Sequence, residues 1–111
     1  MQNDITRIKT ELDAITKAIV DHIPVEEIYL FGSFAYGTPN EDSDIDLYLV
    51  FKDDMQMREI EALAAAHKAM YSLQNRPIDI LGHKKQKFIY RSTGFATIEK
   101  DVSQKGVKLY G

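Results

Sequence analysis

Two aspartates at the start of an apolar segment are the feature that most constrains this chain. Asp44 and Asp46 alternate with apolar residues in the segment DIDLYLVF, whose branched and aromatic side chains predict a β-strand. Because alternate side chains of a strand share a face, both carboxylates point the same way from backbone positions roughly 6.6 Å apart. The opposite face carries Ile45, Leu47, Leu49 and Phe51, and Tyr48 and Val50 make the first face apolar further along. Charges at the end of such a buried strand are costly without a metal or hydrogen-bond donors, so the pattern predicts a site for a hard cation.

A Gly-Ser turn follows the apolar run that precedes these aspartates. Residues 28–31 predict a short strand, and Gly32 and Ser33 follow at once, which indicates a tight turn and a short helix beginning at Ser33. Free backbone N–H groups at a helix start favour phosphate, and glycine lets a ligand approach the backbone closely. Ser43 either bonds a phosphate or closes the turn that positions Asp44, and serine is common in such turns. We therefore predict Gly32, Ser33 and Ser43 as nucleotide-binding residues.

A third carboxylate, Asp79, lies between Ile78 and Ile80 in another short apolar segment. If its strand lies beside that of Asp46, three carboxylates face one pocket. Such a group suits one or two Mg²⁺ ions that bridge the phosphates of a nucleotide and stabilise the attacking and leaving oxygens. We therefore predict Asp44, Asp46 and Asp79 as metal-binding and catalytic residues that act at the phosphates of a nucleotide.

The remaining apolar residues predict helices around these strands. Their spacing predicts amphipathic helices at residues 4–21, with a break at Pro24, at 57–71, and at 88–102, the last weakened near 93–94. The middle helix is long enough for a crossover that places the strands of Asp46 and Asp79 parallel or nearby. After Gly106, the segment VKLY predicts a strand at a sheet edge. The order α-β-α-β-α-β-α-β predicts an α/β fold, a small mixed sheet packed with helices.

The glycine turn and the three carboxylates together resemble a known family. The pattern G-S-x-x-x-G at residues 32–37, S-D-x-D at 43–46 and a later lone aspartate in a strand resembles the nucleotidyltransferase superfamily that includes DNA polymerase beta. The short chain resembles its minimal nucleotidyltransferases, and the resemblance covers residues 25–110. It implies a polymerase beta-like fold. It also implies a magnesium-dependent enzyme with ATP or another nucleoside triphosphate as the substrate. Such an enzyme moves a nucleoside monophosphate, most simply AMP from ATP, to an acceptor hydroxyl and releases pyrophosphate.

The resemblance also assigns roles to single residues. The family's phosphate-binding pair falls on Gly32 and Ser33, its metal-binding pair on Asp44 and Asp46, and its third carboxylate on Asp79. Many relatives carry arginine where this chain has Tyr36, so the role of that arginine at the phosphates or the acceptor is open here. Tyr36 itself either stacks on a base or covers the loop.

The chain length limits what can surround this site. A length of 111 residues predicts one minimal nucleotidyltransferase domain over residues 1–111. Antibiotic-modifying relatives add a helical domain that shapes the acceptor site, and no segment here is left to build one. We therefore expect the acceptor to come from a second subunit, a homo-oligomer or a docked macromolecule. The resemblance implies a helical HEPN-type partner, with this chain as the antitoxin of a toxin-antitoxin system.

Composition narrows the class further. The chain has no cysteine, so disulfides and thiolate metal sites are excluded. No apolar stretch approaches the ~20 residues of a membrane span and the N-terminus lacks a signal-peptide core, so a cytoplasmic location is the expectation. The net charge of −3, from 14 basic and 17 acidic side chains, argues against broad nucleic-acid binding. Local clusters still leave a nucleic acid open as acceptor.

Two questions stay open at the level of sequence. The basic run at residues 83–87 either reaches the triphosphate or an anionic acceptor, or forms a solvated helix start, which is the simpler interpretation. The whole chain is either the enzyme described above or a non-catalytic subunit that holds nucleotide or covers a partner. A structural homodimer with an incidental acidic pocket is the third alternative, and it predicts no magnesium-dependent nucleotide binding.

Overall fold

A four-stranded mixed sheet forms the centre of the molecule, with the strand order β3-β2-β1-β4. The computed structural model describes residues 8–37 and 43–111. The strands are β1 (Val25–Phe31), β2 (Ile45–Phe51), β3 (Ile78–Lys84) and β4 (Val107–Tyr110). β1 runs antiparallel to both β2 and β4, whereas β2 and β3 are parallel. The predicted small mixed sheet, with the VKLY strand at its edge, is therefore confirmed.

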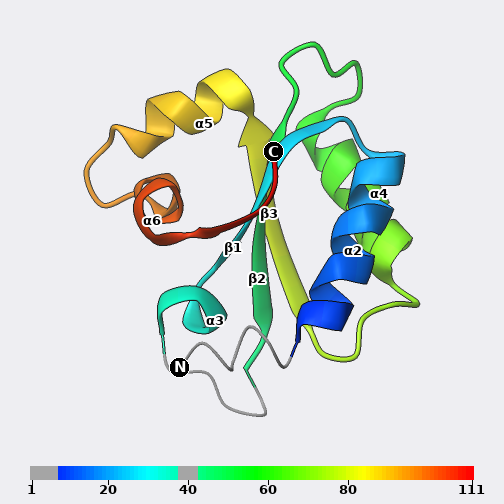
Figure 1. Ribbon diagram of the computed structural model, residues 1–111. Coiled ribbons are helices and arrows are strands. Elements are labelled where there is room, and N and C mark those ends of the chain that lie inside the picture. The colour runs from blue at the N-terminus through cyan, green and yellow to red at the C-terminus, as the bar shows by residue number, and fades with distance from the viewer. Residues whose placement is uncertain (1–7, 38–42) are drawn as a thin grey trace.

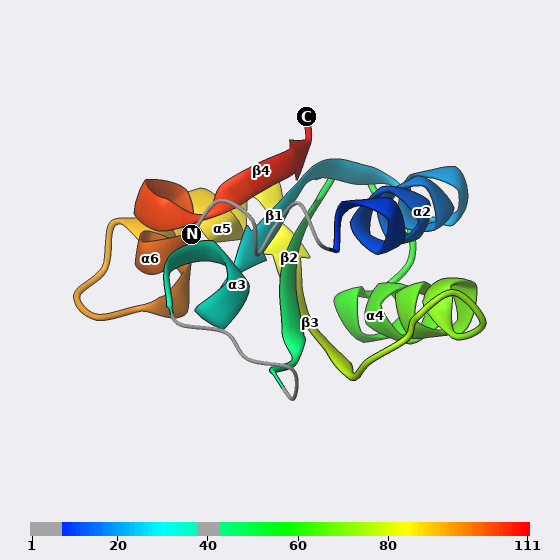
Figure 2. The ribbon, with the colours of Figure 1, turned by 60° about the horizontal axis from the view of Figure 1, so that its bottom comes forward.

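Helices cover both faces of this sheet (Figures 1 and 2). One face packs against α2 (Lys9–His22) and α4 (Glu59–Met70), and the other against α5 (Lys85–Ser92) and α6 (Ile98–Lys105). The short helix α3 (Ser33–Tyr36) lies at one end of the sheet, directly after β1. Since α4 connects β2 to β3, it supplies the crossover that two parallel strands require.

Strand β2 is buried on both faces, as its apolar residues predict. Towards α2 and α4, the main core contains Ile45, Leu47, Leu49 and Phe51. Towards α5 and α6, Tyr48 and Val50 join Phe88 and Val102 in a second core. A strand covered on both faces reads as a nearly continuous apolar run. The two aspartates therefore occur only where β2 begins, at the rim of these cores.

The first helix matches its predicted apolar face. Leu12, Ile15 and Ile19 are buried, and the helix ends at His22 before Pro24. The start of this helix, predicted at residue 4, lies outside the described residues. Within the described part of the chain, no helix is both long and apolar enough to cross a membrane.

The prediction of one helix over residues 88–102 is wrong, because the structure divides this segment into α5 and α6. Ala96 has a φ of 54°, which lies in the left-handed region and interrupts a right-handed helix. Thr97 then begins α6, and its hydroxyl accepts a hydrogen bond from the Lys100 amide at 3.1 Å. The weak point at Thr93 and Gly94 is thus a complete break that lets the second helix turn back along the first.

Candidate active site

The sheet register brings Asp46 and Asp79 side by side. The two residues are direct partners in the parallel pair β2 and β3, so their backbone positions are about 4.8 Å apart. Partner residues on neighbouring strands point to the same face of a sheet. That face is the one covered by α5 and α6, because Asp46 alternates with Leu47 and shares its side with Tyr48. The prediction that Asp79 lies beside the other carboxylates required its strand to be next to that of Asp46, and the two strands are neighbours.

The three predicted carboxylates also influence one another electrostatically. Asp46 is half-buried, and Asp44 lies just before β2. Burial raises the pKa of Asp46 above its ordinary value, and the negative charges of Asp79 and Asp44 raise it further. A nearby cation has the opposite effect, since it favours the charged form of each carboxylate. The negative charges of the three carboxylates thus repel one another, and a bound cation would reduce this repulsion.

Gly32 contacts this acidic group directly. Its φ of 77° and ψ of −151° are accessible mainly to glycine. A Cβ added at this position would overlap the Asp46 carboxylate and lie 3.0 Å from its Cγ. The pairing of Phe31 with Asp46 in the β1–β2 register sets up this approach. Two independent constraints, backbone angle and space, therefore favour glycine at residue 32.

The predicted short helix begins at Ser33. The amides of Ala35 and Tyr36 both donate to the Gly32 carbonyl at 3.0 Å, so the turn of α3 is closed immediately after the glycine. The first amides of a helix have no partner within it, which is the property on which phosphate binding at this turn was predicted. Ser43 is half-buried and directly precedes Asp44. Tyr36 is exposed at the end of α3. The nucleotide-binding roles of Gly32, Ser33 and Ser43 remain predictions.

Magnesium is the metal that these residues fit. Among residues 8–37 and 43–111, no three His, Cys, Asp or Glu side chains already form a metal-binding cluster. The donor set nevertheless has the right chemistry, because Mg²⁺ prefers a few carboxylate oxygens and keeps several waters and substrate oxygens as further ligands. Asp46 and Asp79 are neighbours, and Asp44 lies within electrostatic range of Asp46. The metal site remains a prediction that the donor chemistry supports.

The basic run at residues 83–87 lies at the far end of the sheet. From Asp79 to Lys84 strand β3 rises roughly 16 Å. The Lys84 amide donates to Glu59 at 2.7 Å, and Lys85 Nζ donates to Glu27 at 2.9 Å. A cavity of about 540 Å³ at that end is lined by Glu26, Lys52, Asp53, Asp54 and Lys85. These contacts and this distance do not support contact of the lysines with a triphosphate at the aspartates. They agree better with the interpretation of the basic run as the start of a helix, since α5 begins at Lys85.

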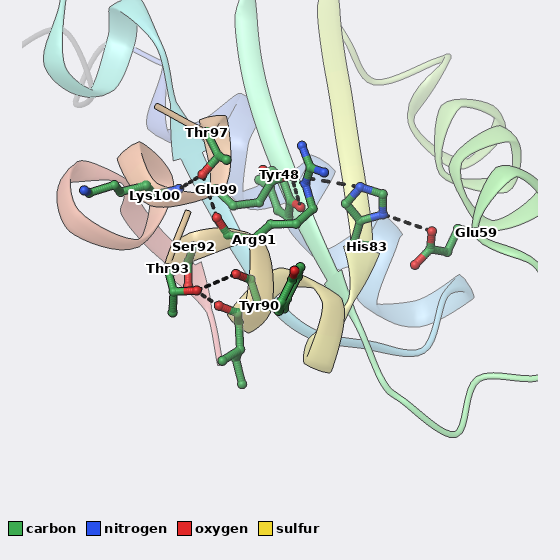
Figure 3. A network of polar contacts seen from close by, with 11 residues as sticks. Tyr48, Glu59, His83, Tyr90, Arg91, Ser92, Thr93, Thr97, Glu99 and Lys100 are labelled. Atoms are coloured by element: carbon green, nitrogen blue, oxygen red, sulfur yellow. Dashed lines mark hydrogen bonds and ion pairs between the residues drawn. The ribbon is translucent and has the colours of Figure 1, made fainter. Parts of the chain in front are cut away.

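A buried polar group behind Asp46 was not anticipated from the sequence. Tyr48 donates to Glu99 Oε2 at 2.8 Å, and Arg91 Nε lies 3.0 Å from Glu99 Oε1. Figure 3 shows His83 between this group and Glu59, with His83 Nδ1 at 3.0 Å from Glu59 Oε1 and Nε2 at 4.0 Å from Glu99 Oε2. Glu99 is only 4% exposed. In the sequence, Glu99 lies three residues before the apolar Val102, so both lie on the same face of α6. That spacing was the available signal that Glu99 is buried.

This polar group fixes α6 to the strand that carries Asp46. Burial by itself raises the pKa of Glu99, but the hydrogen bond from Tyr48 and the nearby Arg91 charge hold it below its ordinary value. Burial, the hydrogen bond to Glu99 and its charge together raise the pKa of Tyr48 far above its ordinary value. Tyr48 therefore remains a neutral donor to an ionised carboxylate, which gives a strong, directional link between β2 and α6.

Fold and site together define a class of protein. A small mixed sheet that places a glycine turn against Asp46, with Asp44 just before the same strand and Asp79 on the neighbouring parallel strand, is the architecture of a nucleotidyltransferase domain. The family model described as "Polymerase beta, Nucleotidyltransferase" matches residues 13–110. The chain belongs to this family, and the predicted superfamily and fold are confirmed.

Solved structures share this fold. The first is a crystal structure of a toxin-antitoxin with AMP-PNP, 25% identical, which superposes with a TM-score of 0.63 over 90% of this chain and 73% of that one. The second is a provisionally assigned nucleotidyltransferase from Sulfolobus solfataricus, 22% identical, with a TM-score of 0.60 over 96% of this chain and 82% of that one. No curated protein sequence matches the chain.

Proposed function

We propose that this chain transfers a nucleoside monophosphate, AMP from ATP, to an acceptor hydroxyl and releases pyrophosphate. The observation that carries the proposal is the direct approach of Gly32 to Asp46, with Asp79 as the next residue across the sheet. A turn suited to phosphate and a group of carboxylates suited to a divalent cation thereby meet at one point. Family membership supports the general reaction.

Each residue at this point has a distinct proposed role. Asp44, Asp46 and Asp79 hold one or two Mg²⁺ ions, which when bound neutralise the phosphates and lower the pKa of the acceptor hydroxyl. Gly32 and Ser33 orient the phosphates, so that pyrophosphate leaves opposite the incoming oxygen. The acceptor oxygen forms a bond to the α-phosphorus as the bond to pyrophosphate breaks. Asp79 is exposed, and it is the candidate acceptor for the hydroxyl proton.

The acceptor is proposed to be part of a partner protein. Residues 1–111 are proposed to form one catalytic domain, and a helical HEPN-type toxin is the proposed partner. The likeness to a toxin-antitoxin solved with AMP-PNP, an analogue of ATP, supports a toxin as the partner and ATP as the nucleotide. The chain would then act as an antitoxin that modifies its toxin.

Labelled ATP tests this proposal. The protein, the helical partner expressed with it, magnesium and ATP labelled at the α-phosphate are incubated, and label on the partner is measured. Asp44→Asn and Asp46→Asn should each reduce transfer about 100-fold or more, since metal stabilisation of charge is worth several kcal/mol. Asp101→Asn, the same change at an exposed position on α6, is the matched control. Transfer that survives both site substitutions would overturn the assignment, and binding without transfer would favour the non-catalytic alternative.

A further inference from the structure

We propose that Lys105 is a nucleotide-contact residue whose ammonium binds the phosphates and whose position is set by the ring of Tyr36. This inference rests on the proposed function, because it places a second contact for the nucleotide beside the Gly32 turn. The chain supplies this cation from the end of α6, which is far from the turn in sequence and close to it in space.

The backbone brings Lys105 to the turn. In the antiparallel pair β1 and β4, Leu30 is the partner of Val107. Antiparallel chains run in opposite directions. Gly32 lies two residues after Leu30 and Lys105 lies two residues before Val107, so both residues lie beyond the same end of this strand pair. In Figure 1 α3 lies below α6, and Lys105 at the end of α6 contacts Tyr36 of α3.

The end of α6 is held tightly against β1. The Gly106 amide donates to the Val102 carbonyl at 2.9 Å, so the helix closes immediately before β4 begins. A Cβ at Gly106 would lie 2.6 Å from that carbonyl oxygen and 3.3 Å from the Leu30 carbonyl oxygen. The absence of a side chain thus permits the close approach, and it fixes where Lys105 leaves the backbone.

The Lys105 side chain extends towards α3. Its Nζ lies 5.8 Å from the centre of the Tyr36 ring, within the range of a cation–π contact. Tyr36 is the last residue of α3, about 6 Å along the helix axis from Gly32. Tyr36 is 41% exposed, so the ammonium held beside its ring is near the surface.

The charge of Lys105 is available to a ligand. In the described part of the chain, no carboxylate lies within 4.0 Å of its Nζ, whereas Lys85 and Lys108 both pair with Glu27. The Asp44, Asp46 and Asp79 charges repel a triphosphate, so nucleotide binding at this end needs cations in addition to the metal. A lysine ammonium is a common phosphate ligand that acts as a point charge with three donors.

Equilibrium binding distinguishes this role from a structural one. Affinities for Mg-ATP and for AMP are measured by titration calorimetry with the full chain. Lys105→Ala should weaken Mg-ATP binding about tenfold, the effect of losing one charged hydrogen bond, and should change AMP binding much less. Lys105→Arg should retain most of the affinity. Lys68→Ala, which removes an exposed lysine from α4 on the opposite face of the sheet, is the matched control.

The ring of Tyr36 is tested separately from its hydroxyl. Tyr36→Phe should bind Mg-ATP like the wild type, and Tyr36→Leu should weaken it about threefold, as expected for an exposed cation–π contact. Equal affinities for Lys105→Ala and Lys68→Ala, with wild type still binding and Asp46→Asn not, would overturn the role of Lys105 and leave the proposed function intact. A wild-type protein that binds no Mg-ATP would overturn both.

Discussion

Gly32 approaches Asp46 so closely that any side chain at residue 32 would occupy the space of the Asp46 carboxylate. Gly32 directly follows the end of β1, and Asp46 is the second residue of β2. The pairing of Phe31 with Asp46 across β1 and β2 sets the separation between Gly32 and Asp46. The same glycine has a φ of 77°, which other residues adopt at a cost. The contact therefore couples the turn at Gly32 to the Asp46 carboxylate, and a single methyl group at residue 32 would disturb both.

Gly32→Ala should impair both stability and transfer. Strain at a positive φ and overlap with a side chain should together lower the free energy of unfolding by about 1–3 kcal/mol, which urea titration measures. Transfer should fall as well, because the Asp46 carboxylate must move. A double-mutant cycle with Asp46→Ala separates the two causes: the stability cost of Gly32→Ala should shrink when the carboxylate is absent. An undiminished cost would show that the overlap is not important.

Asp46→Asn should stabilise the protein in the absence of metal while it abolishes transfer. Burial, Asp79 and Asp44 all disfavour the ionised form of Asp46, so the neutral amide should raise the free energy of unfolding at pH 7 by about 1 kcal/mol. Magnesium should then raise the melting temperature of the wild type more than that of the variant. Asp101→Asn controls for a general effect of charge, and a melting temperature that falls in Asp46→Asn without metal would contradict the repulsion.

Glu99→Gln should remove part of the pH dependence of stability. Because the folded-state pKa of Glu99 lies below its ordinary value of 4.5, its contribution is present above that pH and is lost as pH falls through the lowered value. The variant should lose about 1–3 kcal/mol at pH 7, since Arg91 and Tyr48 lose an ionised partner, and it should lose less near pH 4. Chemical unfolding at both pH values measures this.

The exposed Glu26→Gln provides the comparison for that measurement, because it changes the same group outside the buried cluster. Tyr48→Phe should reproduce part of the Glu99→Gln loss at pH 7, since it removes the hydrogen bond of 2.8 Å but leaves the carboxylate. A Glu99→Gln variant whose stability changes with pH as steeply as that of the wild type would show that another group carries the dependence.

Local patterns were sufficient to predict the elements of the site. The alternation around Asp44 and Asp46 predicts the strand that the structure shows from Ile45 onward, and the length of the following helix is that of a crossover between parallel strands, as β2 and β3 are. The contact of Gly32 with Asp46 depends on the register of β1 and β2, which no local pattern encodes. The link between Tyr48 and Glu99 joins residues 51 positions apart. Such pairings follow only from the packed structure.

The break between α5 and α6 shows the same limit in a different form. Apolar spacing continues from Phe88 to Val102, so periodicity alone predicts one helix. The backbone at Ala96 and the cap at Thr97 divide it, because two short helices can each turn an apolar side to the sheet. This return of the chain is also what carries Lys105 to the Tyr36 ring at the end of α3.

The position of the transferred label tests the central claim most directly. The protein and its co-expressed partner are incubated with magnesium and with ATP labelled at either the α- or the γ-phosphate. Nucleotidyl transfer predicts covalent label on the acceptor from α-labelled ATP only, with labelled pyrophosphate released from γ-labelled ATP, and loss of both signals in Asp46→Asn. Covalent label from the γ-phosphate, or α-label transfer that is unchanged in Asp46→Asn, would contradict the account.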